Sequence, residues 1–385
     1  MIEIRTVDQL DVDGSRVFCR VDFNVPLEGT TITDATRIEE TLPTLRLLRE
    51  RDATIVIASH LGRPKGSHKE KYSLKPVRAK LSELIGADVQ WADDCIGPKA
   101  AQKAAQLKTG QMLLLENLRF HPGEEDNDPS FARALQRLGD YYVNDAFGAS
   151  HRAHASIEAL PLLFGSDHAA GGLLLAKEIE FLQKITNAAD RPFVALLGGA
   201  KIAGKIEPLE ALVKQADTLL IGGGMANTFL AAKGVNMGAS LVDKESIDVA
   251  KRISTGKIIL PIDVVLEDSS VVDVSKGLTQ NQKALDIGPR TIAKFSEVLK
   301  KARTVFWNGP MGMFEKKEFA AGTMAMARAV AEANALTVVG GGESVEAVKA
   351  SGYADRISHI STGGGASLEF IAGAKLPGVE VLRAP

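Results

Sequence analysis

Phe193-Val-Ala-Leu-Leu-Gly-Gly-Ala-Lys-Ile-Ala-Gly-Lys-Ile206 contains the three elements of an α/β unit in their order along the chain. Its first five residues are apolar, which is typical of a short strand buried on both faces. A glycine-rich loop follows, and a helix is expected over 205–215. Buried strand, loop and helix in this order indicate a parallel sheet covered by helices.

The same alternation continues on both sides of this stretch. Strands are expected at 16–23, 54–58, 111–115, 141–144, 218–221, 304–307 and 336–339. Helices are expected at 35–51, where Pro43 could kink or divide the helix, and at 76–85 and 225–232. A chain of 385 residues exceeds what one core usually serves. We therefore predict an α/β protein with two doubly wound, parallel-sheet (Rossmann-like) domains.

A helix expected over 171–185 separates two kinds of loop chemistry. Leu174, Ile179, Leu182 and Ile185 recur at helical spacing. Most histidines lie upstream of this helix, and most glycines lie downstream. We predict a first domain over 1–170 that binds a small anion. A second domain over 171–365 would bind a nucleotide and would include 171–185 as a hinge helix. An ordinary domain linker is the alternative for this helix.

Composition and charge exclude several classes of protein. The chain is 45% apolar and 24% charged, and no apolar run reaches the roughly 18 residues of a membrane span. Cys19 and Cys95 lack paired spacing, and the N-terminus lacks an apolar signal region. A disulfide or zinc framework is therefore not expected. The net charge of −2 argues against nucleic-acid binding. We expect a cytoplasmic monomer with neither a nucleic-acid nor a membrane partner.

The loops that follow the first-half strands carry cations and hydrogen-bonding side chains. Ligands of doubly wound folds bind beyond the carboxyl ends of the strands. Converging guanidinium groups suit a compact polyanion such as a phosphorylated carboxylate, and short polar side chains could bind its hydroxyl groups. A surface salt bridge is the alternative for any single arginine. The candidates are Asp22, Asn24, Arg37, His60, Arg63, Arg119 and Arg152.

The second-half loops suit a nucleotide. Residues 199–205 match the first seven positions of a P-loop, but Ile206 stands where a P-loop has Ser or Thr. Small residues still allow backbone N–H groups to approach phosphate, and Lys201 and Lys205 could neutralise it. Further glycine clusters follow strands at 222–224, 340–342 and 363–365. Glu315 could accept ribose hydroxyls, and Glu343 is the candidate Mg²⁺ ligand. Tight helix–strand packing is the alternative for these glycines.

The chain resembles the phosphoglycerate kinase family over essentially its full length. Eight motifs carry the resemblance, and the first and the Trp-Asn-Gly-Pro run are the most specific. They are Arg20-Val-Asp-Phe-Asn-Val-Pro26, Ser59-His-Leu-Gly-Arg-Pro64, Glu116-Asn-Leu-Arg-Phe120, Asp145-Ala-Phe-Gly148, Gly198-Gly-Ala-Lys201, Gly222-Gly-Gly-Met225, Val305-Phe-Trp-Asn-Gly-Pro310 and Ser361-Thr-Gly-Gly-Gly-Ala366.

The resemblance implies a hinge-bending enzyme that transfers phosphate between 1,3-bisphosphoglycerate and ADP, giving 3-phosphoglycerate and ATP with Mg²⁺. Arg37 and Lys201 would stabilise the transferring group. The family's last segment implies that residues 366–385 return to the first domain. The implied acid-binding residues are Asp22, Phe23, Asn24, Arg37, His60, Leu61, Gly62, Arg63, Arg119 and Arg152. The implied nucleotide-binding residues are Gly199, Ala200, Lys201, Lys205, Gly223, Ala284, Asn308, Glu315, Gly341, Gly342, Glu343 and Ser344, with Glu343 on the metal.

The chain departs from the family pattern in three places. Glu343 replaces the usual Asp, and Ala284 replaces the usual Gly. The loop between the two lysines reads Ile-Ala-Gly in place of the common Val-Ser-x. The first departure concerns the metal, and the second concerns the nucleotide pocket. A non-catalytic nucleotide-binding protein on this fold and a kinase for another acyl phosphate remain alternatives.

Overall fold

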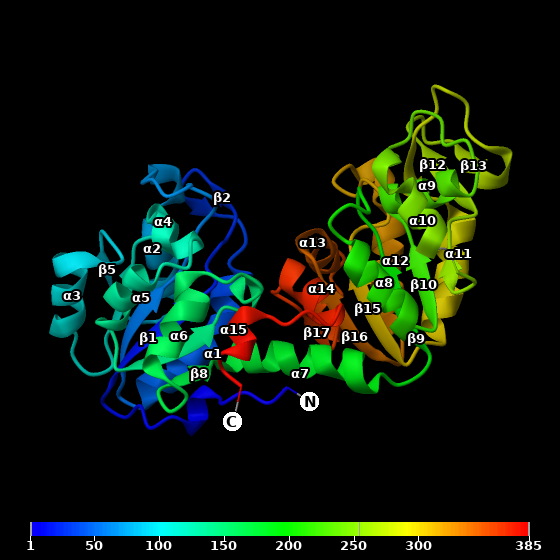
Figure 1. Ribbon diagram of the computed structural model, residues 1–385. Coiled ribbons are helices and arrows are strands. Elements are labelled where there is room, and N and C mark those ends of the chain that lie inside the picture. The colour runs from blue at the N-terminus through cyan, green and yellow to red at the C-terminus, as the bar shows by residue number, and fades with distance from the viewer. Residues whose placement is uncertain (1, 254, 384–385) are drawn as a thin grey trace. The chain divides into compact units, whose positions relative to one another are not determined.

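The computed structural model describes residues 2–253 and 255–383, which form two compact units (Figure 1). Unit 1 contains the described residues up to Glu180 and those from Lys375 onwards, and unit 2 contains Phe181–Ala374. The boundary expected after residue 170 therefore falls ten residues later, inside a helix. The returning segment begins at Lys375 instead of about residue 366.

Unit 1 is built on a six-stranded parallel sheet whose strands run in the order β5-β6-β4-β1-β7-β8. The central strands β1, β4, β6 and β7 were predicted from their apolar runs. The edge strands β5 and β8 were not. The bounds are β1 Arg16–Val21, β4 Thr54–Ala58, β5 Val89–Ala92, β6 Met112–Leu115, β7 Tyr141–Asp145 and β8 Ala169–Gly171.

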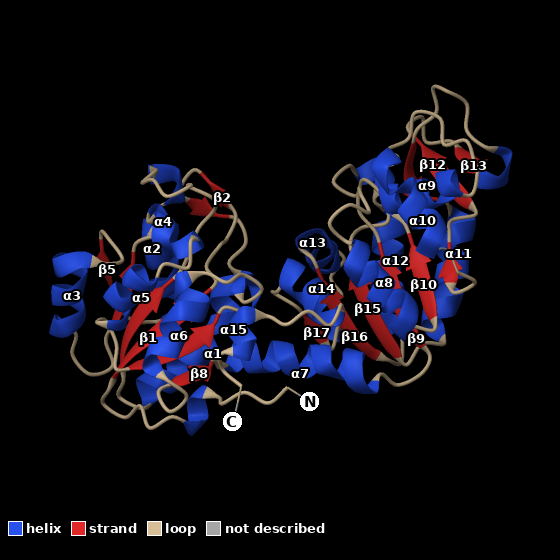
Figure 2. Cartoon of the chain, viewed as in Figure 1, coloured by secondary structure: helices blue, strands red, loops and turns tan. Residues whose placement is uncertain are grey.

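Helices pack against this sheet, as Figure 2 shows in blue around the red strands. A short hairpin, β2 Leu27–Glu28 with β3 Thr31–Ile32, precedes the first helix. Pro43 lies inside α1 without dividing it. The helices of unit 1 are α1 Thr36–Glu50, α2 Lys75–Ile85, α3 Gly97–Gln106, α4 Pro122–Glu125, α5 Pro129–Gln136, α6 Leu160–Phe164 and α15 Pro377–Glu380.

Unit 2 contains a second parallel sheet with the order β11-β10-β9-β15-β16-β17. When only the strands of this sheet are numbered, in chain order, the arrangement is 3-2-1-4-5-6, which is the strand order of dinucleotide-binding Rossmann domains. The order reverses between β9 and β15, and ligands of such folds bind at this switch point. The strands are β9 Phe193–Leu197, β10 Thr218–Ile221, β11 Ile258–Ile259, β15 Thr304–Asn308, β16 Leu336–Gly340 and β17 His359–Ile360.

A three-stranded antiparallel sheet, not expected from the sequence, also belongs to unit 2. It consists of β12 Asp263–Leu266, β13 Val271–Asp273 and β14 Ala284–Ile287. The helices of unit 2 are α8 Ile206–Gln215, α9 Gly223–Ala232, α10 Ile247–Ile253, α11 Pro289–Lys300, α12 Ala321–Glu332, α13 Gly342–Ala350 and α14 Gly365–Ile371. Two doubly wound parallel-sheet domains are thus confirmed as the fold class.

The last segment of the chain divides between the two units. Helix α14 stays in unit 2, where the side chain of Gln215 donates to the carbonyl of Ile371 at 3.0 Å. Helix α15 packs in unit 1, and the buried amide of Asn144 at the end of β7 donates to the carbonyl of Gly378 at 3.2 Å. The C-terminal residues therefore complete unit 1, but only after α14 has ended.

Helix α7, Leu173–Ala188, is the expected connecting helix, and its first turn is fixed by a buried carboxylate. Asp145 ends β7, and its Oδ1 accepts from the backbone N–H groups of Leu174 and Leu175 at 2.9 and 3.1 Å. Its Oδ2 is buried and has no hydrogen-bond partner in the described chain. Burial therefore raises the pKa of Asp145 to about 6.

This raised pKa predicts a pH dependence of stability. The unfolded chain ionises Asp145 near pH 4, whereas the folded chain holds the proton up to about pH 6. The free energy of unfolding should therefore fall as pH rises from 4 to 6, by up to about 3 kcal/mol. Asp145→Asn should remove the contribution of Asp145 to this slope and leave the fold intact, because the amide oxygen still accepts both N–H groups. Urea unfolding across pH 4–7 measures it, with the exposed Asp126→Asn as control. Equal slopes in wild type and Asp145→Asn would contradict the assignment.

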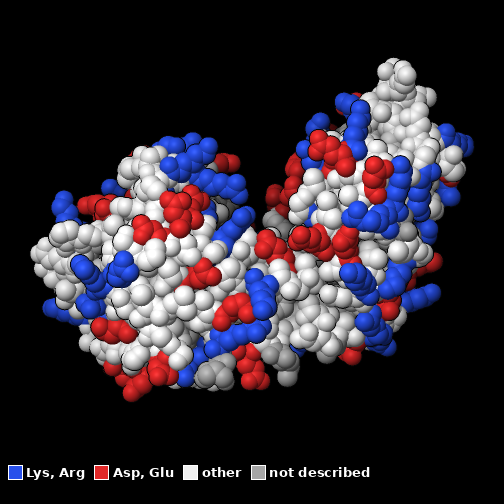
Figure 3. Space-filling view, in the orientation of Figure 1, with Lys and Arg blue, Asp and Glu red and all other residues white. Residues whose placement is uncertain are grey.

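The surface carries charges of both signs. On the face in view, Figure 3 shows Lys and Arg interspersed with Asp and Glu over each unit. This mixture agrees with the net charge of −2. Within the described ranges, every helix is too short or too polar to cross a bilayer.

Candidate functional site

The unit 1 candidates lie after the carboxyl ends of the central strands. Asp22 and Asn24 follow β1, His60 follows β4, and Arg119 lies on a 3-10 turn, Leu118–Phe120, after β6. Neighbouring parallel strands end at one edge of a sheet, so these loops meet. We call Asp22, Arg37, His60 and Arg119 the unit 1 cluster.

An ion pair holds the centre of the cluster. Nη1 of Arg37, on the first turn of α1, donates to Oδ2 of the buried Asp22 at 2.7 Å. Burial tends to raise the pKa of Asp22, but the positive charges of Arg37 and Arg20 and the hydrogen bond from the N–H of Asn24 outweigh it and hold the pKa below its usual value. Asp22 is therefore an anion that positions the guanidinium of Arg37.

His60 is neutral and has a defined tautomer. Burial, together with the charges of Arg119, Arg20 and Arg37, lowers the pKa of His60 well below its usual value despite the opposing effect of Asp22. Nη2 of Arg20 lies 3.2 Å from Nδ1 of His60, and a guanidinium only donates. Nδ1 is therefore the acceptor, and the ring proton is on Nε2. His60 can offer this N–H to a ligand at neutral pH.

Backbone contacts orient the other two polar side chains. The N–H of Gly62 donates to Oδ1 of Asn24 at 2.9 Å, which fixes the amide so that its NH₂ group remains as a donor. Nη1 of Arg119 donates to the carbonyl of Gly62 at 2.9 Å, and its Nε lies 3.5 Å from Glu125. Asn24 and Arg119 thus flank the same glycine.

Not every unit 1 candidate presents its side chain to this cluster. Phe23 and Leu61 are buried, at 0% and 4% exposure, and could contact a ligand only through their backbone. Arg63 is exposed and makes no side-chain hydrogen bond within the described residues. Arg152 is also exposed, and its Nε donates to Nε2 of His151 at 3.0 Å. Asp22 therefore pairs with Arg37 and lies 3.9 Å from Nδ1 of His60, and Arg119 contacts Gly62 and Glu125. Arg63 and Arg152 lie outside these contacts.

In unit 2 the loops at the switch point pack backbone against backbone. A Cβ at Gly198 would lie 2.0 Å from the carbonyl oxygen of Pro310, and a Cβ at Gly309 would lie 2.3 Å from that of Gly198. Gly309 also has a φ of +95°, which disfavours other residues. The loops after β9 and β15 can approach this closely only with glycine at both positions.

Gly309→Ala should therefore damage the site. Because the carbonyl of Gly198 has to move and φ stays positive, we expect a loss of about 1–3 kcal/mol in the free energy of unfolding. Nucleotide affinity should fall at the same time. Thermal unfolding and calorimetric titration with ADP measure both. Gly256→Ala, where a Cβ meets no atom within 4 Å, is the matched control, and equal stability of the two variants would refute the close-packing account.

A cavity of about 180 Å³ opens beside these loops. Its walls are largely apolar, with a few polar groups, as is usual for a small-molecule site. Six of the nucleotide candidates line it: Gly199, Ala200, Gly223, Ala284, Glu315 and Glu343. We call this cavity the unit 2 pocket.

The remaining nucleotide candidates take different positions. Nζ of Lys205 lies 3.3 Å from the carbonyl of Gly198 and 3.4 Å from Oδ1 of Asn308. Burial lowers the pKa of Lys205, and the carboxylate of Glu343 partly opposes this. Lys201 is exposed, on the loop before α8. Ser344 is buried, and its hydroxyl accepts from the N–H of Gly309, so its side chain supports the loop after β15.

Comparison with known proteins agrees with the two doubly wound sheets and the glycine loops. The profile of the family described as phosphoglycerate kinase matches residues 7–374. The chain belongs to the phosphoglycerate kinase family.

Relatives and solved structures agree with this membership. The phosphoglycerate kinase of Moorella thermoacetica is 50% identical over 389 residues, covering 98% of both chains. That of Pelotomaculum thermopropionicum is 47% identical, again over 98% of both. The phosphoglycerate kinase structure from Coxiella burnetii superposes with a TM-score of 0.87 at 36% identity over 99% of both chains. The phosphoglycerate kinase structure from Pyrococcus horikoshii superposes with a TM-score of 0.89 at 34% sequence identity, covering 99% of this chain and 98% of the matched chain.

Two of the three departures from the phosphoglycerate kinase pattern, Ala284 and Glu343, line the unit 2 pocket. Ala284 begins β14 and lines the pocket with a methyl group where the family usually has none. Glu343 lies in the first turn of α13, exposed and lining the same pocket. An acidic first-turn residue also stabilises a helix dipole, so this position fits either role.

Sequence reasoning missed two groups that shape these sites. Arg20 is fully buried in β1, where its Nε donates to Ser156 at 2.8 Å and its Nη2 lies 3.9 Å from Glu124. A charged residue inside a buried apolar strand has to be paired, so the position of Arg20 in the sequence already indicated a buried partner for its guanidinium. Asp286 on β14 lines the unit 2 pocket and accepts from the N–H of Gly322 at 2.7 Å. Burial raises the pKa of Asp286 to about 7, which no sequence pattern indicates.

Proposed function

We propose that this chain is a phosphoglycerate kinase that transfers a phosphoryl group between 1,3-bisphosphoglycerate and ADP, giving 3-phosphoglycerate and ATP. The observation that supports this most is the family match over residues 7–374 together with a cationic cluster in unit 1 and a glycine-walled pocket in unit 2. The reaction breaks the bond between the acyl oxygen and phosphorus. It forms a bond from the same phosphorus to a terminal phosphate oxygen of ADP, and the carboxylate leaves.

We assign the acid substrate to unit 1. Arg37 and Arg119, with the exposed Arg63 and Arg152, supply cations for a phosphate and a carboxylate. The NH₂ of Asn24, which donates no hydrogen bond to the described residues, and the Nε2–H of neutral His60 are donors for a hydroxyl or carboxylate oxygen. Both oxygens of Asp22 already accept hydrogen bonds, from Arg37 and from the N–H of Asn24 at 3.2 Å. A substrate hydroxyl that donates to Asp22 would therefore have to share one of these oxygens with its present donor.

We assign the nucleotide to unit 2. The apolar walls of the pocket suit a base, and Glu315 is placed to accept ribose hydroxyls. Helix α9 begins at Gly223, where backbone N–H groups suit a phosphate, and Lys205 adds a positive charge. Glu343 offers a carboxylate oxygen, the ligand type that Mg²⁺ prefers, so it fits the magnesium site that the family implies. Bound there with the nucleotide, Mg²⁺ would neutralise phosphate charge.

The protein's task in this reaction is positioning and charge stabilisation. An acyl phosphate is already activated, so no nucleophile has to be created. Arg37 of unit 1 and Lys201 of unit 2 are the proposed stabilisers of the negative charge on the transferring group. Because the two substrates are assigned to different units, catalysis requires that the bound substrates are brought together.

An assay with a panel of acyl phosphates tests this function. We expect MgADP to be converted to ATP with 1,3-bisphosphoglycerate and only weakly with acetyl phosphate, which lacks the hydroxyl and second phosphate. Asn24→Ala should reduce the difference between the two donors, because it removes the donor assigned to a hydroxyl. Equal use of both donors would indicate a kinase of broader specificity. ADP binding without ATP formation would indicate a non-catalytic nucleotide-binding protein.

We also propose that the enzyme is a cytoplasmic monomer. Cys19 and Cys95 are both free and buried, which is compatible with a reducing compartment. Light scattering coupled to size exclusion should give one chain of 41.0 kDa. A mass of twice this value would refute the monomer.

A further inference from the structure

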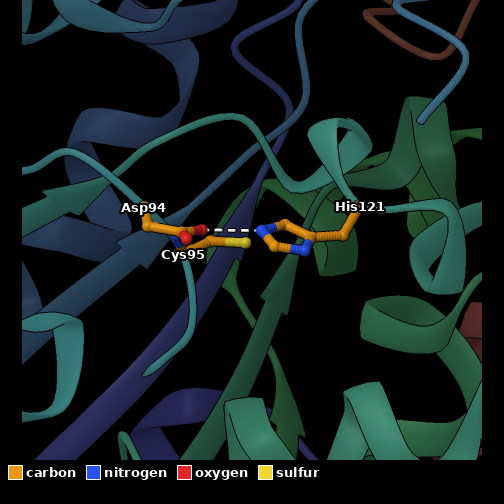
Figure 4. Close-up of side chains that lie close together, drawn as sticks. All are labelled: Asp94, Cys95 and His121. Carbon is orange, nitrogen blue, oxygen red and sulfur yellow. Dashed lines mark hydrogen bonds and ion pairs between the residues drawn. The ribbon is translucent and has the colours of Figure 1, made fainter. Parts of the chain in front are cut away.

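Three potential metal ligands meet in unit 1 at a place that the proposed reaction does not use. Asp94 and Cys95 lie between β5 and α3, and His121 lies between the 3-10 turn 118–120 and α4. Their ligand atoms, a carboxylate oxygen, Sγ and a ring nitrogen, all lie within 4.8 Å of one another. Figure 4 shows the three side chains converging from these two segments.

The three ligand atoms lie near enough for one metal ion to reach all of them after a small adjustment. Oδ1 of Asp94 lies 2.6 Å from Nε2 of His121, and it also accepts from the backbone N–H of Cys95 at 2.7 Å. Around tetrahedral Zn²⁺, with bonds of about 2.0–2.3 Å, ligand atoms lie roughly 3.3–3.7 Å apart. The Asp94–His121 pair thus has to open slightly. The ring of His121, 5.4 Å from that of Phe131 between centroids, keeps Nε2 facing the other two.

The thiol of Cys95 is the observation that points to a ligand. Cys95 is 0% exposed, and its Sγ has no hydrogen-bond partner in the described chain although it points at two polar groups. Burial, followed by the charges of Asp94 and Glu124, raises the pKa of this thiol well above its usual value. The same carboxylates that disfavour a thiolate favour a cation beside it. Asp94 and His121 remain partly exposed, at 50% and 29% for their side chains, so an ion could enter.

We propose that Asp94, Cys95 and His121 form a site for one borderline-soft divalent cation of the zinc type. Sulfur, imidazole nitrogen and carboxylate oxygen together select such an ion over Mg²⁺, which prefers oxygen alone. Water would fill the fourth position. Binding releases the thiol proton to solvent, and His121 binds the ion through an unprotonated Nε2 with its ring proton on Nδ1. The site joins two loops, one of which carries Arg119 two residues before His121.

Cobalt titration of the intact protein tests the site. Co²⁺ replaces Zn²⁺ with similar ligands and gives a sulfur-to-cobalt charge-transfer absorption only when a thiolate is bound. Excess Mg²⁺ is present to occupy oxygen-ligand sites. Both cysteines lie in unit 1, so cobalt in the unit 2 pocket cannot produce this band. We expect one Co²⁺ per chain to give the band with release of one proton, and one equivalent of Zn²⁺ to abolish the band by displacing Co²⁺ without further proton release.

Single substitutions identify the ligands. Cys95→Ser should abolish the charge-transfer band, and Cys19→Ser, at the other buried cysteine, should leave it unchanged. Asp94→Asn and His121→Asn, at partly exposed positions, should each weaken Co²⁺ binding by at least about tenfold. Thermal unfolding in the absence of metal shows that each variant is folded.

Two results would overturn the proposal. One is the absence of the band in wild type at excess Co²⁺, and the other is a band that survives in Cys95→Ser. Unchanged Co²⁺ affinity in Asp94→Asn or His121→Asn would remove that residue from the ligand set and leave too few ligands for the proposed site.

Discussion

Arg37→Ala should lower kcat by roughly 100-fold or more while the affinity for ADP stays nearly unchanged. Arg37 belongs to unit 1, whereas the nucleotide is assigned to unit 2. Its guanidinium is held 2.7 Å from Asp22, a fixed orientation for a group that stabilises charge in the transition state. Its loss also removes the main positive charge that lowers the pKa of Asp22, so this pKa should rise. Steady-state kinetics and calorimetry with ADP measure the two effects.

Two further variants separate charge from geometry at Arg37. Arg37→Lys keeps a positive charge without the planar fork, so we expect partial rescue. Arg46→Ala removes an exposed arginine from the same helix and should leave kcat unchanged. Wild-type turnover in Arg37→Ala would remove this residue from the mechanism.

Glu343→Ala should weaken the use of MgADP far more than the use of the acid substrate. A magnesium ligand supplies charge next to the phosphates, and Glu343 lines the unit 2 pocket near Lys205. Glu343→Asp, which restores the family's usual residue, should retain activity within about tenfold, or roughly 1.4 kcal/mol. Position 343 follows a glycine run, where the backbone can shift enough to compensate for a side chain that is one methylene shorter. Magnesium titrations at fixed ADP measure the effect.

Helix capping is the competing explanation for Glu343. Gly341 precedes α13 without a side-chain cap, so an acidic first-turn residue could serve the helix alone. Glu346→Ala, one turn further along the same helix and exposed, is the matched control. If Glu343→Ala keeps the wild-type magnesium curve and loses only thermal stability, Glu343 is a cap and not a metal ligand.

The strands that the sequence predicted are those in the middle of the sheets. Thr54–Ala58 and Phe193–Leu197 have the expected bounds because both faces are buried, and burial requires continuous apolar runs. Within the two parallel sheets, the strands that were missed are β5, β8, β11 and β17, which are the four edges. Edge strands are short and pair on one side, so their composition carries little signal. The doubly wound fold was therefore predictable, and its edges were not.

Local sequence identified the loops of the site better than the contacts inside them. His60, Arg119 and Lys205 could be named as candidates because they follow strands, which all end at one edge of a sheet. The tautomer of His60 was not predictable, since it depends on Arg20, forty residues away in the chain. The proximity of Asp94, Cys95 and His121 was not predictable either, because their spacing in the sequence fits no short metal-binding motif. Such contacts are set by tertiary packing and not by any local pattern.

Paired binding titrations of Arg63→Ala and Lys205→Ala test most directly whether unit 1 binds the acid and unit 2 the nucleotide. Arg63 makes no side-chain hydrogen bond in the described structure, and Lys205 makes only two long ones, of 3.3 and 3.4 Å. Both variants should therefore fold. Calorimetry should show that Arg63→Ala loses affinity for 3-phosphoglycerate but not for ADP, and that Lys205→Ala does the reverse. Equal losses of both affinities in either variant, or no loss in both, would contradict the assignment.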